Sequence, residues 1–154
     1  MQHASSPEEL VALAATIESW LDDQLAENPI VAAVDRDEDP DILRWFVRVN
    51  GEEKDVFSVW LHLRQRTLHY ETYVMPAPEE NQEEFYAYLL RRNSDLMGAA
   101  FSIGAEEAIF LAGALPNHAI DPDELDRILG SVYVWVERFF RPALRIGFAS
   151  RFRS

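Results

Sequence analysis

The sequence predicts an α+β domain in which an antiparallel sheet of about five strands is covered by helices, in the order α-β-β-β-α-β-β-α. Three observations lead to this prediction. Apolar residues recur at helical spacing near the start, in the middle and near the end of the chain. Between the first two helical segments, apolar and polar residues alternate in runs joined by short turns, which is typical of an antiparallel meander. Two further apolar runs around Gly104 predict a hairpin before the last helix.

The first predicted helix begins after Ser6. Ser6, Pro7 and Glu9 match a capping box with proline at the first helical position, so the first turn can satisfy its free N–H groups. Asn28 precedes Pro29, and the residue before a proline disfavours helical geometry, which predicts the end of the helix. Between these limits one apolar stripe recurs at helical spacing and consists of Leu10, Leu13, Ile17, Leu21 and Leu25.

The first strands are predicted directly after this helix. Residues 30–34 form a short apolar run that predicts an edge strand, and an acidic loop follows at 35–41. Residues 42–49 then alternate with period two, which predicts a strand. One side of it carries Leu43, Trp45, Val47 and Val49, and the other side carries Ile42, Arg44, Phe46 and Arg48.

Two more strands complete the predicted meander. Asn50-Gly51 favours a tight turn, because both residues tolerate a positive φ. The strands follow at 56–63 and 68–75, and the prolines after Met75 end the ladder, since proline has no N–H to donate. Their predicted inner side chains are Phe57, Val59, Leu61, Leu63, Leu68, Tyr70 and Val74.

The second half of the chain predicts a helix and a hairpin. Residues 82–97 show helical periodicity, and Gly98 can cap the C-terminal end of that helix. Residues 99–103 and 108–115 are apolar runs separated by a polar turn, which predicts two paired strands. Almost all of these side chains suit packing, and none of them forms a pattern of catalytic groups.

The last predicted helix opens at Asp121-Pro122, with the same capping logic as the first. Pro142 is expected to end or kink it, because proline removes one helical hydrogen bond. Its apolar stripe consists of Leu125, Ile128, Leu129, Val132, Val136 and Phe139.

Length and composition predict one folded domain over residues 1–154, with disorder expected only at 1–5 and at about 150–154. The chain has 154 residues, of which 48% are hydrophobic, so it can bury a sizeable core. It has no cysteine, which excludes disulfides, thiolate nucleophiles and cysteine-ligated zinc. The sequence shows neither a signal peptide nor an apolar run long enough to span a bilayer, so we expect a cytoplasmic protein that does not enter the membrane.

Charge is distributed unevenly. The net charge is −13, which argues against broad binding to nucleic acid. All 27 acidic residues lie at or before Glu137, whereas five of the 14 lysines and arginines follow it. In this basic tail, Arg138, Arg141 and Arg145 are interleaved with aromatic residues, a pattern typical of platforms for single-stranded nucleic acid. The alternative is that the arginines face the acidic surface of the same chain or of a second subunit.

A search for catalytic chemistry finds little. Asp35, Asp37 and Asp39 have the spacing of a calcium loop, but the required glycine is replaced by proline and the required glutamate by phenylalanine. No nucleophile elbow and no glycine-rich phosphate loop is present. We therefore assign no catalytic, cofactor-binding or metal-binding residue and expect a protein that is not an enzyme.

The alternative that remains open is an unrecognised enzyme that uses His62, His69 and Glu71. These residues are predicted on neighbouring strands, and histidine–carboxylate pairs can shuttle protons or bind metal.

Aromatic residues on the predicted sheet point instead to binding. Together with Trp135, the residues Trp45, Trp60, Tyr70 and Tyr73 are more than one small sheet face can bury, and aromatic residues are enriched at interfaces. A cluster of Trp45, Trp60 and Trp135 open to solvent would mark a recognition face. Trp45, Trp60, Tyr70 and Tyr73 are the candidate binding residues of the sheet, as Arg138, Arg141 and Arg145 are of the tail. The leading prediction is a non-enzymatic module that holds a segment of a partner protein.

Four segments resemble the YbjN-domain family: Arg66 to Pro78, Tyr86 to Gly104, the pair Leu115-Pro116, and Glu124 to Glu137. That family is bacterial, is common in actinobacteria and is labelled in places as sensory-transduction regulators. Its fold is similar to that of type III secretion chaperones, which are small and dimeric. The resemblance implies a chaperone-like or regulatory function, an unidentified protein partner, no cofactor and a homodimer. The shared element of Leu89, Leu90 and Asn93 suggests packing, and the basic tail departs from the chaperone pattern.

Overall fold

The computed structural model describes residues 3–152. This part of the chain forms three α-helices and a sheet of six strands, with three short 3-10 turns between or after them. In chain order the elements are α1 (Pro7–Glu27), β1 (Val31–Arg36), β2 (Arg44–Asn50), β3 (Val56–Leu63), β4 (Thr67–Met75), α2 (Gln82–Asn93), β5 (Ala99–Ile103), η1 (Ala105–Glu107), β6 (Ile109–Pro116), η2 (Asn117–Ala119), α3 (Pro122–Gly147) and η3 (Ala149–Phe152).

The sheet confirms the predicted α+β class. Its strand order is β1-β2-β3-β4-β6-β5, and every neighbouring pair is antiparallel. It has six strands rather than about five, because β1 pairs with β2 from Val31 to Arg36. The apolar run at 30–34 is therefore a full edge strand, extended by two charged residues.

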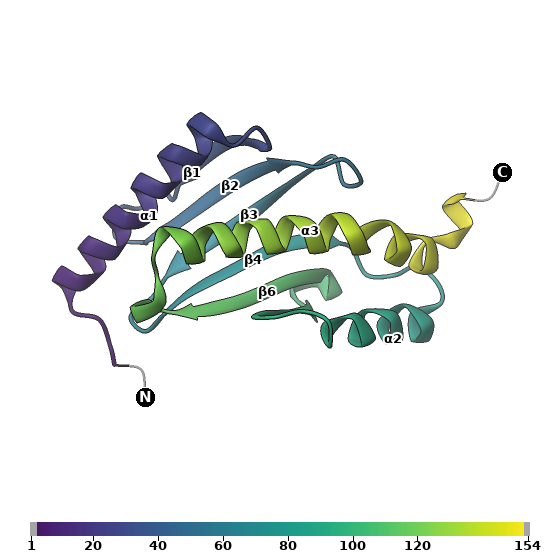
Figure 1. Cartoon of the computed structure of the whole chain (residues 1–154). Helices are drawn as coiled ribbons and strands as arrows, with labels where there is room; N and C mark the ends of the chain where they lie inside the picture. The colour runs from purple at the N-terminus through teal and green to yellow at the C-terminus, as the bar shows by residue number, and fades with distance from the viewer. Residues whose placement is uncertain (1–2, 153–154) are drawn as a thin grey trace.

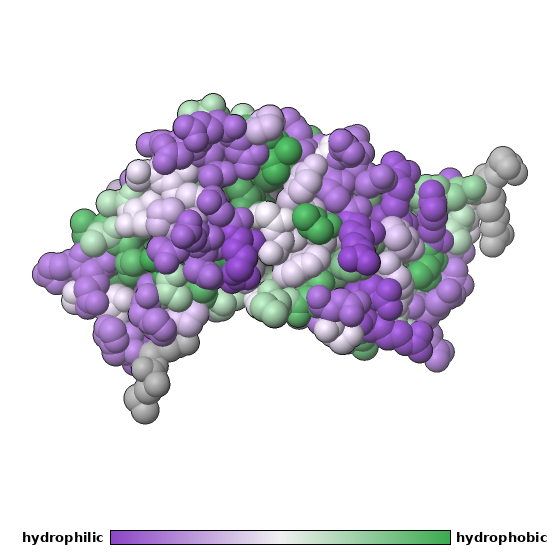
Figure 2. All heavy atoms as spheres, viewed as in Figure 1, coloured by the Kyte–Doolittle hydropathy of each residue, from purple (hydrophilic) through white to green (hydrophobic). Residues whose placement is uncertain are grey.

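The helices cover one face of this sheet, as Figure 1 shows. α3 runs across the strands, α1 lies over the side of β1, and α2 lies against β5 and α3. The predicted inner side chains of the meander are buried beneath them, with Leu43 half-buried at the margin. Hydrophilic residues cover most of the outer surface of this helical layer, with small apolar areas between them (Figure 2).

Two predicted helix ends are wrong. α2 ends at Asn93, four residues before the predicted end, because the side chain of Asn93 binds the backbone of Phe101 instead of solvent. Pro142 does not end α3, which continues as far as Gly147, and the alternative that Pro142 kinks this helix stays a prediction. The predicted capping box of α1 is confirmed, with Ser6 Oγ accepting from the N–H of Glu9 and Glu9 Oε1 from the N–H of Ser6.

The chain start differs from the expectation of disorder at residues 1–5. Ser5 is buried, its N–H donates to the carbonyl of Gln65 at 2.7 Å, and its hydroxyl accepts from Asn117 at 3.0 Å. Near the other end, residues up to Phe152 form η3. The remaining parts of that expectation, residues 1–2 and 153–154, lie outside the described residues. Within residues 3–152, no helix has both the length and the hydropathy that crossing a bilayer requires.

Candidate protein-binding surface

The second face of the sheet is not covered by a helix in the described part of the chain (Figure 1). We call it the open face. Strand alternation and register assign to it the side chains that point away from α1 and α3. Its members are Arg44, Phe46 and Arg48 on β2, Ser58, Trp60 and His62 on β3, His69, Glu71 and Tyr73 on β4, and Phe110, Ala112 and Ala114 on β6.

Four aromatic rings on the open face form two edge-to-face pairs. Phe46 and Trp60 are direct cross-strand partners, with ring centroids 5.3 Å apart and planes at 89°. Tyr73 and Phe110 are partners across β4 and β6, at 5.7 Å and 85°. Trp60 is 43% exposed and Tyr73 is 45% exposed. Large aromatic side chains held rigidly and left open to solvent are the residues that most often anchor protein interfaces.

Two of the predicted binding residues are buried and cannot contribute to this surface. Trp45 is 1% exposed, lies on the helical side of β2 and donates from Nε1 to Glu18 of α1 at 3.2 Å. Tyr70 is 3% exposed, and its hydroxyl donates to the carbonyl of Gly98 at 2.7 Å. In both strands, alternation places these residues on the same side as the buried side chains, so they face the core. Trp135 of α3 is half-buried against the core, so the tryptophans do not form one exposed cluster.

Phe46 and Phe110 belong to the open face but were missing from the predicted binding residues. The alternation of residues 42–49 already placed Phe46 opposite to Trp45, so its position could have been read from the pattern. The position of Phe110 depends on the register between β4 and β6, in which it faces Tyr73. No local pattern in the sequence specifies that pairing.

Basic groups gather at one end of the open face. His62 is the direct cross-strand partner of both Arg44 and His69. Burial lowers the pKa of His62, and the positive charges of Arg44, Arg64 and His69 lower it further, against a smaller opposing effect of Asp37. The imidazole of His62 is therefore neutral at pH 7, in a field that is positive.

A shallow hollow of about 230 Å³ lies among these groups. Trp60 and Glu71 also line it, so an aromatic ring and one carboxylate border the basic side chains. Arg44 is held in place by Asp37, whose Oδ2 accepts from Nε at 3.0 Å and from Nη2 at 2.6 Å. This ion pair fixes the guanidinium at the margin of the hollow.

The residues of the alternative enzymatic reading do meet on this face. His62 faces His69 across the ladder, and Glu71 lies two residues further along β4, opposite Trp60. In the described residues, however, no group of three or more histidine, cysteine, aspartate or glutamate side chains is arranged to hold a metal ion. These three residues lie on an open part of the sheet surface, and Trp60 is the aromatic side chain beside them.

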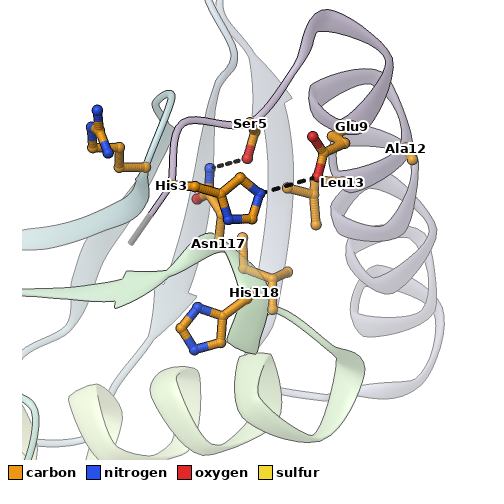
Figure 3. Close-up of a pocket in the computed structure, with 9 residues that line it drawn as sticks. His3, Ser5, Glu9, Ala12, Leu13, Asn117 and His118 are labelled. Atoms are coloured by element: carbon orange, nitrogen blue, oxygen red, sulfur yellow. Dashed lines mark hydrogen bonds and ion pairs between the residues drawn. The ribbon is translucent and has the colours of Figure 1, made fainter. Parts of the chain in front are cut away.

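Another hollow, of about 290 Å³, lies between the chain start, α1 and η2 (Figure 3). Asn117 is its central side chain and donates to Ser5 Oγ at 3.0 Å and to the carbonyl of Arg64 at 2.8 Å. His3 Nε2 lies 3.6 Å from Glu9 Oε2, and both side chains are largely exposed. These contacts fasten the chain start to the β3–β4 turn, so the residues at this hollow have a structural role.

The predicted arginines of the tail lie on α3, away from the open face. Arg141 forms an ion pair with Glu53, and Arg138 lies 5.4 Å from the ring centroid of Phe139. Arg145 is exposed. Arg151 further along binds Glu79 through two contacts of 2.7 Å. Of the two interpretations of the tail, these pairs favour arginines that face the acidic surface of the same chain.

Comparisons with known proteins agree with the fold and the resemblance. Residues 13–145 match the model of the YbjN family, described as "Putative bacterial sensory transduction regulator". An uncharacterized protein of Mycobacterium tuberculosis is 36% identical over 104 residues, which are 68% of this chain and 57% of that protein. One of Mycobacterium leprae is 35% identical over 109 residues, or 71% and 59% of the respective chains. This chain thus spans less than two thirds of the length of these relatives.

A similar fold occurs in a chain of the solved HopA1–SchA chaperone–effector complex. The TM-score is 0.56 at 14% identity, and the match covers 84% of this chain and 95% of that chain. The predicted similarity in fold to type III secretion chaperones is confirmed. At this identity the likeness concerns the fold alone.

Proposed function

This chain belongs to the YbjN family, and from that premise we propose that it is a non-enzymatic protein-binding module that holds a segment of a partner protein on its open face. The observation that carries the proposal is the pair of exposed aromatic contacts, Phe46–Trp60 and Tyr73–Phe110, on a sheet face that no helix within residues 3–152 covers. Exposed rings in fixed positions lose little conformational freedom on binding, so they suit recognition. The role is chaperone-like or regulatory, and we place it in the cytoplasm.

Two further observations support this proposal. The helical layer buries the apolar side chains of the other sheet face, so the open aromatic residues are not needed for the core. The fold is shared with a chain from a chaperone–effector complex, an assembly in which one protein holds another. Arg141 and Arg151 of the tail pair with carboxylates of the same chain, which leaves the open face as a better candidate than a nucleic-acid site on α3.

Site-specific photocrosslinking in the source cells tests this function. A benzophenone amino acid is placed at Tyr73 on the open face and, as a matched control, at Phe152 of η3, which is a similarly exposed aromatic residue. The expected result is a reproducible protein adduct from position 73 that is absent from position 152, and that is lost when Trp60→Ala is added. Equal adducts from both positions, or none from position 73, would contradict the proposal.

We also propose a homodimer, formed through the end of the molecule that carries α2 and β5. Leu90, Met97 and Ile103 are exposed apolar side chains on these elements and the loop between them. Arg141 and Arg151 already pair within the chain, so an apolar contact is favoured over one between the basic tail and an acidic face. Analytical ultracentrifugation should show a dimer that salt does not weaken and that Met97→Glu dissociates. A dimer that dissociates as salt rises would argue for the charged interface instead.

A further inference from the structure

The open face differs in charge from the rest of the molecule. The chain carries a net charge of −13, yet Arg44, Arg64 and two histidines lie on or beside one end of this face, and Arg48 lies further along β2 on the same face. Arg44 is neutralised by Asp37. Arg48 and Arg64 are exposed and take part in no salt bridge within residues 3–152. Their charge is therefore available to a bound partner.

The local field supports the same conclusion. His62 is packed between β2 and β4, and the groups that act on it are Arg44, Arg64, His69 and Asp37. Burial is the largest cause of the lowered pKa of His62, and it disfavours a charge of either sign. The remaining shift comes from the three basic groups, whose effect Asp37 offsets only in part, and positive charges that disfavour a cation favour an anion by the same electrostatic interaction. Glu71 also lines the hollow, and the basic groups there outnumber the carboxylates.

Shape adds a second constraint. The basic hollow holds about 230 Å³ and is bordered by Trp60, which is half of the Phe46–Trp60 pair. A hollow of this size accepts one side chain and not an extended ligand. A carboxylate placed there would leave the next apolar side chain of an extended segment close to the exposed indole, since successive same-side residues of a strand are about 7 Å apart.

On the basis of the proposed function, we propose that the partner segment is acidic and apolar: an aspartate or glutamate side chain occupies the hollow between Arg64 and His62, and a neighbouring apolar side chain packs on Trp60. The segment lies extended along the open face. Nucleic acid is the less suitable occupant, because a polyanion would extend beyond the small basic area and meet the strongly acidic remainder of the chain. A single carboxylate avoids this repulsion, because charges are screened over about 8–10 Å in physiological salt.

The test uses two-dimensional ¹H–¹⁵N NMR titrations of the whole chain with blocked nonapeptides. In the first peptide a single glutamate lies two residues from a leucine in an otherwise neutral polar sequence, in the second glutamine replaces that glutamate, and in the third lysine replaces it. The acidic peptide should shift the Trp60 indole N–H signal and bind about fivefold or more tightly than the glutamine peptide, the size expected for one or two partly exposed charge contacts. The lysine peptide should bind more weakly than either.

Matched variants locate the effect. Arg64→Gln and Arg145→Gln remove the same charge, the first beside the hollow and the second on α3. Arg64→Gln should remove most of the preference for the acidic peptide, and Arg145→Gln should leave it unchanged. His62→Gln should abolish the rise in affinity that we expect for the acidic peptide when the pH falls below the lowered pKa of His62, since protonation of that imidazole adds positive charge to the hollow.

The outcomes separate the two proposals. If the acidic and glutamine peptides bind the open face equally well, the charge inference is wrong and the binding function stands. If none of the three peptides shifts the Trp60 signal, the open face is not a peptide-binding surface and both proposals fail there. If a short oligothymidylate binds more tightly than the acidic peptide, with loss in Arg64→Gln, the site recognises phosphate and the acidic segment is refuted.

Discussion

Asn93 closes the open edge of β5, and its removal should destabilise the fold. Its Nδ2 donates to the carbonyl of Phe101 at 3.2 Å, and its Oδ1 accepts from the N–H of Phe101 at 2.7 Å. Phe101 is the middle residue of β5, which is an edge strand of the sheet. The side-chain amide thus takes the place of a neighbouring strand. Unpaired edges are the usual starting point of unwanted strand pairing, so this contact also protects the middle of β5 against pairing with a strand of another chain.

The magnitude follows from the groups that Asn93→Ala would leave unpaired. Phe101 is buried, and a buried backbone group without a partner costs about 1–3 kcal/mol. Water can reach part of an edge, so we take the lower half of this range for each of the two groups. Alanine is the better helix former by up to about 0.7 kcal/mol, which offsets part of the loss. The expected decrease in the free energy of unfolding is about 1.5–3 kcal/mol, or about 3–12 °C in Tm.

Urea unfolding followed by far-ultraviolet circular dichroism measures this change. The midpoint should fall while the slope with urea stays the same, as expected for a loss of stability without a change in the denatured state. Arg91→Ala is the matched control, because it alters an exposed residue of the last turn of α2 and should change stability by less than about 0.5 kcal/mol. If Asn93→Ala is no less stable than this control, the edge-closing role is wrong.

Further substitutions test the assignment of the sheet faces, the positive field at His62 and a contact of α3 with the β2–β3 turn. Trp45→Ala should lower the free energy of unfolding by about 3–5 kcal/mol and Trp60→Ala by no more than about 1 kcal/mol, because only the ring of Trp45 is buried. Equal losses of stability in calorimetry would contradict the assignment of the two sheet faces. Arg44→Gln should raise the pKa of His62 in an NMR titration, because a positive charge is removed, and leave it below its ordinary value, because His62 stays half-buried. An unchanged pKa would refute the claim that Arg44 contributes to a positive field at His62. Glu137→Gln should lower the free energy of unfolding in urea by about 1 kcal/mol, because the carboxylate of Glu137 accepts from two backbone N–H groups of the β2–β3 turn at 2.7 and 2.6 Å. A variant as stable as the parent would show that the fold does not need this contact.

The outcome for the candidate binding residues shows where sequence reasoning worked. Strand alternation puts Trp45 on one side with Val47 and Val49, and Tyr70 on the predicted inner side, and the structure buries both. The number of aromatic residues predicts the opposite, because it is too large for one sheet face, and this argument includes both residues among the recognition residues. The local pattern was the better guide. Trp60 and Tyr73 point to the other side of their strands, and these two side chains are exposed to solvent.

The role of Asn93 shows where it could not work. The sequence identified the element of Leu89, Leu90 and Asn93 and suggested packing for it. Leu89 does pack in the core, whereas Asn93 binds a strand backbone eight residues further along the chain. That contact requires the C-terminal end of α2 to lie beside the edge of β5, and nothing in the spacing of the residues specifies this arrangement.

Local chemistry alone determined the order of the elements, the inner side chains of the strands and the helix starts, because each depends on backbone geometry over a few neighbouring residues. The tertiary structure decided which surface was left free. The arginines and histidines of the basic hollow come from three strands and a turn, and only the register of the sheet brings them together around His62. All three helices pack on the other face, so the aromatic pairs remain in solvent. Register and helix docking arise from contacts between distant residues, and such contacts leave no local pattern in a single sequence.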